Sequence, residues 1–176
     1  MTAPFRDVDH ALKFAFAIRE YRIEPRNMLS RLVVTEHGAE LLPAGPATSL
    51  TAWDWHAQSA LILARLSQLE RPLLAYCLAF YAWGAERVVA FAELEQLMME
   101  RCGITDRIVV EGLVRRHVNR FRGIKAPTPY SIHKRSGTSR RAIDYLAELI
   151  RTELEQLETA LENTLHDYWQ ETGLVG

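Results

Sequence analysis

The sequence has little cysteine and no long hydrophobic run. Its 176 residues include two cysteines, Cys77 and Cys102, too few for a disulfide framework or a cysteine-rich zinc site. No apolar stretch reaches the roughly 18 residues that a membrane span needs, and the first ten residues carry acids where a secretory signal would be cationic. We therefore expect a soluble, cytoplasmic protein whose two cysteines pack in the core.

The motifs of common enzyme classes are also missing. The sequence contains no P-loop, no glycine-rich dinucleotide fingerprint and no serine-nucleophile elbow. Its histidines show no spacing such as HExxH, which would place two metal ligands on one face of a helix. The acids cluster on the expected outer side of the last helix, whereas a nuclease needs carboxylates that converge on a metal. We expect no enzymatic activity, no cofactor and no metal site.

Positive charge is concentrated in one segment, although the net charge of the whole chain is only −1. Residues 112–143 contain no carboxylate, and residues 144–176 contain eight acids against one cation. The segment 112–143 carries nine cations: Arg115, Arg116, Arg120, Arg122, Lys125, Lys134, Arg135, Arg140 and Arg141. Such segregation is typical of a surface that meets a polyanion.

Helical periodicity dominates the sequence, and the alternation typical of strands is nearly absent. We predict an all-α helical bundle with a C-terminal helix-turn-helix that leads into a long terminal helix. The predicted division is an N-terminal helical body, 1–123, and a C-terminal part, 124–176, which could also form one continuous domain. The long helix starts at Thr138, because no proline or glycine follows until Gly173.

Two segments fit the pattern of a helix-turn-helix, in which a glycine-containing turn joins a supporting helix to a helix that reads the major groove. The first uses Leu94–Arg101, Gly103 and a helix from Thr105, its cap, to His117. The second uses Ser131–Ser136, Gly137 and the helix that opens with Thr138. We favour the second for DNA contact, because its exposed start is rich in hydroxyls and arginines, whereas the first opens with Asp106 and Glu111.

The predicted DNA contacts fall into two groups. Contacts to bases or nearby phosphates are assigned to Thr138, Ser139, Arg140 and Arg141. Contacts to the phosphate backbone are assigned to Arg115, Arg116, Arg120, Arg122, Lys125, Lys134 and Arg135. The second group supplies affinity but little sequence discrimination, because it acts through charge.

The apolar residues of the last helix form a stripe that a lone helix cannot bury. They recur at steps of three, four and seven from Ile143 to Tyr168. The helix must lie along the core or pair with a second copy. Pairing is slightly preferred, because a homodimer would double the basic surface.

The segment SIHKRSGTSRRAIDYLAELIRTELEQLETAL resembles the C-terminal helix-turn-helix, akin to region 4 of sigma factors, of phage late-gene regulators of the antitermination Q type and related prophage proteins. The resemblance covers about the last third of the chain. It implies a prophage-encoded transcription regulator that acts on double-stranded DNA, with RNA polymerase as a possible partner.

A different class of function also fits the charge pattern. The basic segment would then belong to a helical protein-interaction or assembly module, in which it pairs with acidic helices of the same or a neighbouring subunit. A salt series of DNA binding distinguishes the two, because phosphate contacts weaken steeply with ionic strength.

Overall fold

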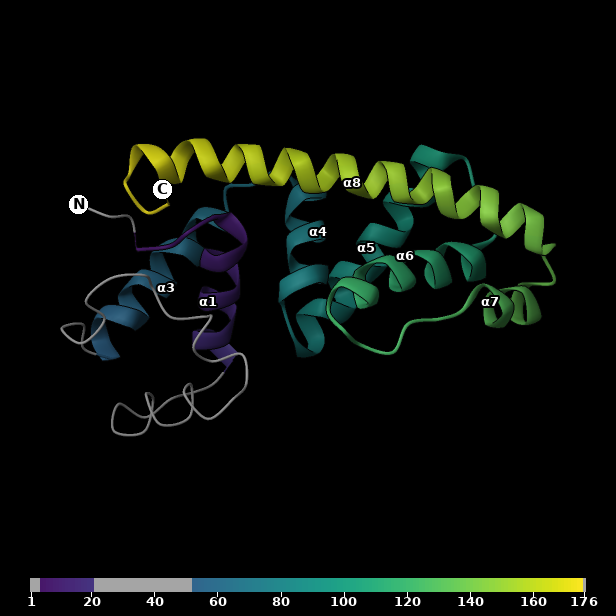
Figure 1. Ribbon diagram of the computed structural model, residues 1–176, viewed down its shortest axis with the longest axis horizontal. Coiled ribbons are helices and arrows are strands. Elements are labelled where there is room, and N and C mark those ends of the chain that lie inside the picture. The colour runs from purple at the N-terminus through teal and green to yellow at the C-terminus, as the bar shows by residue number, and fades with distance from the viewer. Residues whose placement is uncertain (1–3, 21–51, 176) are drawn as a thin grey trace. The chain divides into compact units, whose positions relative to one another are not determined.

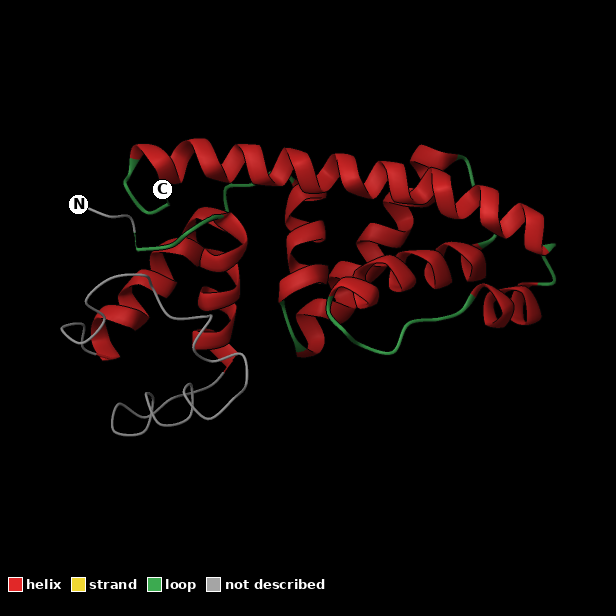
Figure 2. Cartoon of the chain, in the orientation of Figure 1, coloured by secondary structure: helices red, strands yellow, loops and turns green. Residues whose placement is uncertain are grey.

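The computed structural model describes residues 4–20 and 52–175, which form seven helices and no strand. The prediction of an all-α fold is confirmed (Figure 2). The helices are α1 (Val8–Glu20), α3 (Ala52–Leu66), α4 (Arg71–Tyr81), α5 (Gly84–Cys102), α6 (Arg107–Phe121), α7 (Pro129–Ser136) and α8 (Arg140–Glu171). None of these helices is both long enough and apolar enough to cross a membrane.

The chain forms two compact units (Figure 1). Unit 1 combines residues 1–69 with 162–176, and unit 2 comprises residues 70–161. The predicted division at residue 123 does not coincide with these limits. The reason is that α6, which ends before residue 123, packs against α7, which follows it, so both belong to unit 2.

In unit 1, α1 packs against α3. Asp7 caps α1, as its position in the sequence suggests, and its Oδ1 accepts a hydrogen bond from the backbone N–H of His10 at 2.8 Å. The rings of Phe14 and Trp55 meet edge to face, 5.8 Å apart, in the buried centre. The backbone N–H of Phe5 donates to the carbonyl of Leu174, so both ends of the described chain contribute to this unit.

In unit 2, α5 packs against both α4 and α6 (Figure 1). The sequence suggests Gly84 as a left-handed cap that ends the helix starting at Arg71, but α4 already ends at Tyr81. Gly84 has the expected positive φ of 61° and is the first residue of α5. Gly103, with φ 64°, ends α5 as predicted.

The short helix α7 begins with a capping box. The hydroxyl of Thr128 accepts from the N–H of Ser131, and the Ser131 hydroxyl accepts from the N–H of Thr128. Gly137, with φ 75°, closes α7, because its left-handed conformation is one that residues with a side chain rarely adopt. Of the residues predicted to point inward at the turn, Ile132 and Ile143 are buried and Leu146 is half-buried.

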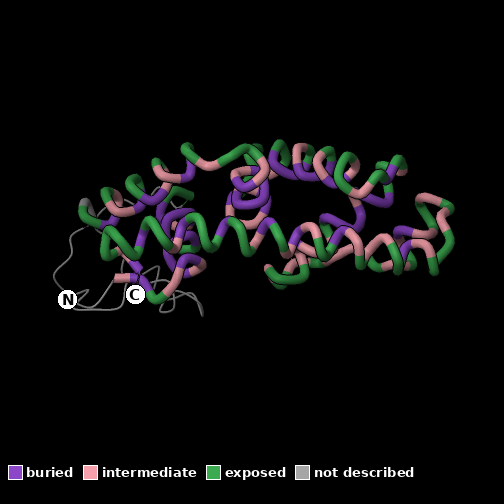
Figure 3. The backbone as a smooth tube through the Cα atoms, turned by 90° about the horizontal axis from the view of Figure 1, so that it is seen from above, coloured by how far each residue is buried: buried purple, intermediate pink, exposed green. Residues whose placement is uncertain are grey.

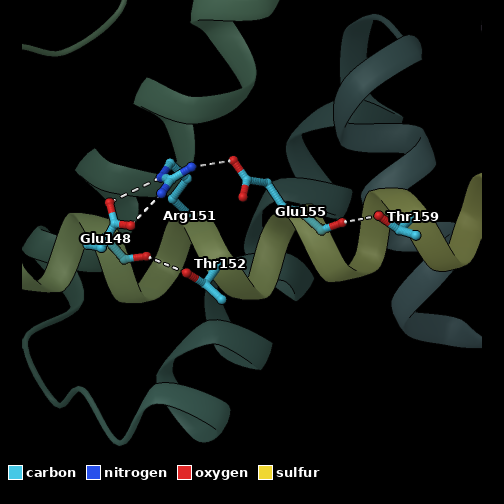
Figure 4. Close-up of polar contacts among 5 residues, drawn as sticks. All are labelled: Glu148, Arg151, Thr152, Glu155 and Thr159. Atoms are coloured by element: carbon cyan, nitrogen blue, oxygen red, sulfur yellow. Dashed lines mark hydrogen bonds and ion pairs between the residues drawn. The ribbon is translucent and has the colours of Figure 1, made fainter.

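The apolar stripe of α8 is covered by the chain itself (Figure 3). Its buried members are Ile143, Ile150, Leu154, Leu157, Leu161, Leu165 and Trp169. Among the described residues, the stripe therefore gives no support for pairing with a second copy, and the expected homodimer stays a prediction. On the outer side, Arg151 makes hydrogen-bonded ion pairs with Glu148 and Glu155 within the same helix (Figure 4).

Candidate nucleic-acid interface

Four cations gather where α7 ends and α8 begins, and we call them the turn cluster. Lys134 and Arg135 lie in the last turn of α7, and Arg140 and Arg141 are the first two residues of α8. All four are exposed. The turn between the helices comprises only residues 137–139 (Figure 1). The two predicted helices of this motif are present, although α7 begins two residues earlier than expected, at Pro129, and α8 begins at Arg140 and not at Thr138.

The members of the turn cluster differ in how firmly they are held. The guanidinium of Arg140 lies over the ring of Tyr130, 5.0 Å from its centroid. Arg135 lies 3.8 Å from a carboxylate oxygen of Glu111, a long ion pair. The side chains of Lys134 and Arg141 form no hydrogen bond or ion pair with any other described residue. These two side chains are thus the most available to an incoming ligand.

The two hydroxyl residues of the turn have internal roles. Thr138 is half-buried, and its Oγ1 donates to Oδ2 of Asp106 at 3.2 Å. Ser139 is exposed and caps α8, because its Oγ accepts from the N–H of Ala142 at 3.2 Å. Thr138 therefore faces the first turn of α6, and Ser139 retains a hydroxyl proton that it can donate outward.

Arg115 and Arg116 lie on α6 and are engaged with their own chain. Nε of Arg115 is 3.5 Å from Oε1 of Glu95 and 3.6 Å from Oε1 of Glu111. Arg116 donates to the carbonyl of Pro127 at 3.0 Å. Both arginines hold neighbouring segments of unit 2 together, a use that the sequence did not reveal.

The other predicted phosphate contacts lie at the far end of α6. Arg120, Arg122 and Lys125 are about 20 Å from the start of that helix, given a rise of 1.5 Å per residue over its 15 residues. Arg122 is half-buried and donates to the carbonyl of Ala82 at 3.2 Å, and its guanidinium lies 4.2 Å from the centroid of the Trp83 ring. The basic segment is therefore two separate surfaces.

The first helix-turn-helix candidate, formed by α5, Gly103 and α6, also has the expected order of helices. Its cap differs from the prediction: Asp106, not Thr105, accepts hydrogen bonds from the N–H groups of Ile108 and Val109. This carboxylate also receives the hydroxyl of Thr138. The start of α6 thus presents an acid and is packed beside the turn of the second candidate, which makes it a poor surface for a polyanion.

The described residues show no group of three or more His, Cys, Asp or Glu side chains that could hold a metal ion. Cys77 is buried, as expected for a core residue, and burial raises the pKa of its thiol. Cys102 is half-buried, and burial also raises its thiol pKa.

Two aromatic residues beside the second basic surface were missed by the sequence reasoning. Phe121 is 61% exposed and Trp83 is 48% exposed. Phe121 lies between Arg120 and Arg122 in the sequence, and this alternation of aromatic and basic residues was a signal that could have been used.

Comparison of the chain with protein-family models and with curated proteins finds no match.

Proposed function

We propose that the protein is a DNA-binding transcription regulator and that the helix-turn-helix formed by α7, Gly137 and α8 contacts duplex DNA. The observation that supports this most strongly is the turn cluster. Four exposed cations occupy two helix ends that are joined by a three-residue turn, and two of them open the second helix. In a helix-turn-helix, the start of the second helix is the part that enters the major groove.

Arg140 and Arg141 would then approach base edges or the adjacent phosphates, and Lys134 and Arg135 would neutralise backbone phosphates. The N–H groups of the first turn of α8 add a favourable environment for a phosphate, because the start of a helix carries partial positive charge. Ser139 sits at this end and can donate its hydroxyl proton. The side chain of Arg141 has no hydrogen-bond or ion-pair partner among the described residues, which leaves its fork of donors free to bind guanine.

The regulatory class rests on the resemblance of residues 131–161 to phage regulators of the antitermination Q type. An antiterminator-like role would involve RNA polymerase as a partner and a prophage origin. Transcription in vitro past a terminator tests the antitermination role alone. Unchanged read-through in the presence of the protein would refute antitermination but would not bear on the proposal of DNA binding.

The alternative, a protein-interaction or assembly module, draws support from the ion pairs that basic residues already make with acids of the same chain. Arg101 and Glu153 form such a pair between α5 and α8, and Arg115 does so with Glu95 between α6 and α5. An equivalent pairing between molecules would use the turn cluster against exposed acids of α8. The experiment below distinguishes the two.

DNA binding is tested by fluorescence anisotropy with a mixed-sequence duplex in a salt series. The double variant Arg140→Ala/Arg141→Ala should lose about 10-fold or more in affinity at low salt, and its salt dependence should become shallower by about one unit for each lost phosphate contact. The control Arg71→Ala/Arg151→Ala removes the same charge from α4 and from the middle of α8, and should stay within about 2-fold. Undetectable duplex binding at low salt, or equal losses in both double variants, would refute the proposal.

A further inference from the structure

A second cationic surface lies at one corner of unit 2, where α4 ends, α5 begins and α6 ends. We call its four cations, Arg87, Arg120, Arg122 and Lys125, the corner cluster. Arg87 donates to the carbonyl of Ala79 at 3.1 Å, and Arg122 donates to the carbonyl of Ala82 at 3.2 Å. These two contacts connect α5 and the end of α6 to the last turn of α4, so the corner is a fixed arrangement.

The charge of the corner cluster is not matched by acids. The guanidinium of Arg87 also donates to the neutral amide oxygen of Asn119, at 2.8 Å. Burial and the charge of Arg87 together lower the pKa of Arg122 to about 10, and no carboxylate opposes these effects. Arg120 and Lys125 are exposed, and their side chains have no hydrogen-bond or ion-pair partner among the described residues. The corner therefore attracts an anion.

Exposed aromatic rings lie among these cations. Trp83 is partly covered by the guanidinium of Arg122. The ring of Phe121 is held by Phe80, with centroids 6.2 Å apart, and by His117, at 5.1 Å, yet more than half of this residue remains exposed. Rings held in this way lose little conformational freedom when a flat ligand stacks on them.

Phosphate charge combined with accessible flat rings is the chemistry of single-stranded nucleic acid. A duplex offers phosphates but hides the faces of its bases, so it would leave Phe121 and Trp83 without a partner. We propose that the corner cluster, with Phe121 and Trp83, binds a single-stranded nucleic acid by backbone charge and base stacking. Backbone charge and base stacking do not depend on the 2′-OH, so the strand is expected to be held without selection of its sugar.

The test measures binding of labelled oligo(dT) and oligo(U) to the full chain by fluorescence anisotropy. Phe121→Ala should lower affinity for both strands about 5-fold or more, the loss expected for one stacked base. The variant Arg120→Ala/Lys125→Ala should lower affinity similarly and flatten the salt dependence. Controls are Leu61→Ala, which removes an exposed apolar side chain from α3, and Arg71→Ala/Arg151→Ala; both should stay within about 2-fold.

Several results would overturn the proposal. Unchanged affinity in both corner variants would exclude the site, and thermal melts of the same samples would establish that the variants are folded. If Arg140→Ala/Arg141→Ala lost as much affinity for the oligonucleotides as the corner variants do, single-strand binding would have to be assigned to the turn cluster. A preference of about 10-fold for one sugar would contradict binding by charge and stacking alone. Displacement of both oligonucleotides by a lower concentration of poly-glutamate would identify an acidic polypeptide as the occupant.

Discussion

Among the described residues, Glu95 is the one carboxylate that is buried, with 4% of its surface exposed. It lies on α5 and faces Arg115 of α6. Burial raises the pKa of this carboxyl, the charge of Arg115 opposes the rise, and nearby Glu111 adds to it. The folded protein therefore favours the protonated form more than the unfolded chain does.

From this we predict a pH dependence of stability. A raised carboxyl pKa contributes stability that is fully present below the ordinary value of 4.5 and is lost as the pH rises through the folded value. Glu95→Gln should therefore raise Tm at neutral pH, by about 2–4 °C if the gain is about 1 kcal/mol. It should also flatten the profile of Tm against pH above 4.5. Calorimetry across this range checks both effects.

Glu93→Gln is the matched control, because Glu93 lies on the same helix and pairs at the surface with Arg71. This control should change Tm little, since surface ion pairs contribute about 1 kcal/mol or less. A lower Tm for Glu95→Gln at neutral pH would show instead that the ion pair with Arg115 outweighs the cost of burying the charge.

At the scale of the helices, the contact between α6 and α7 depends on a glycine. Gly112 lies inside α6, where glycine costs about 1 kcal/mol relative to alanine. A Cβ built at this position would lie 2.7 Å from Cγ1 of Ile132, which is buried on α7. The glycine thus lets α7, the supporting helix of the proposed DNA-binding motif, approach α6 closely.

We predict that Gly112→Ala destabilises the protein by about 1–2 kcal/mol, because overpacking outweighs the gain in helix propensity. Urea unfolding gives the free energy of unfolding. In an Ile132→Ala background the same change should be neutral or stabilising, since the clash is gone and the propensity gain remains. Stabilisation by Gly112→Ala in the wild-type chain would show that α7 can shift away at no cost.

The sequence was most informative about where helices end and least informative about what side chains touch. The glycines at 103 and 137 both end helices as predicted, because a left-handed residue is a local requirement. The roles of Arg115 and Thr138 could not be predicted, since Glu95 and Asp106, their partners, are 20 and 32 positions away in the sequence. An exposed charge and an internally paired charge look the same in a sequence.

At the scale of the whole molecule, unit 1 is built from two distant parts of the sequence. Leu165, Trp169 and Val175, which belong to its C-terminal part, are almost completely buried. Burial of one large apolar side chain contributes about 1.5–3 kcal/mol, so the three together approach the entire stability of a typical domain. Unit 2 contains none of these residues.

We therefore predict that a chain ending at Leu161 keeps unit 2 folded and loses the structure of unit 1. Hydrogen exchange should show rapid exchange in α1 and α3, and retained protection in α5 and α6. In the full chain, Trp169→Ala should weaken protection of α1 and α3, while Gln170→Ala, its exposed neighbour, should not. Full protection of α1 and α3 in the shortened chain would contradict this prediction.

The discontinuity of unit 1 also sets an order of events during protein synthesis. All residues of unit 2 precede residue 162, so the synthesis of unit 2 is complete before that of unit 1. Helices α1 and α3 are made earlier but must wait for residues 162–175 before their core is complete. Until then their apolar faces lack part of their cover, and this early segment is the one that a chaperone would be expected to engage on the ribosome.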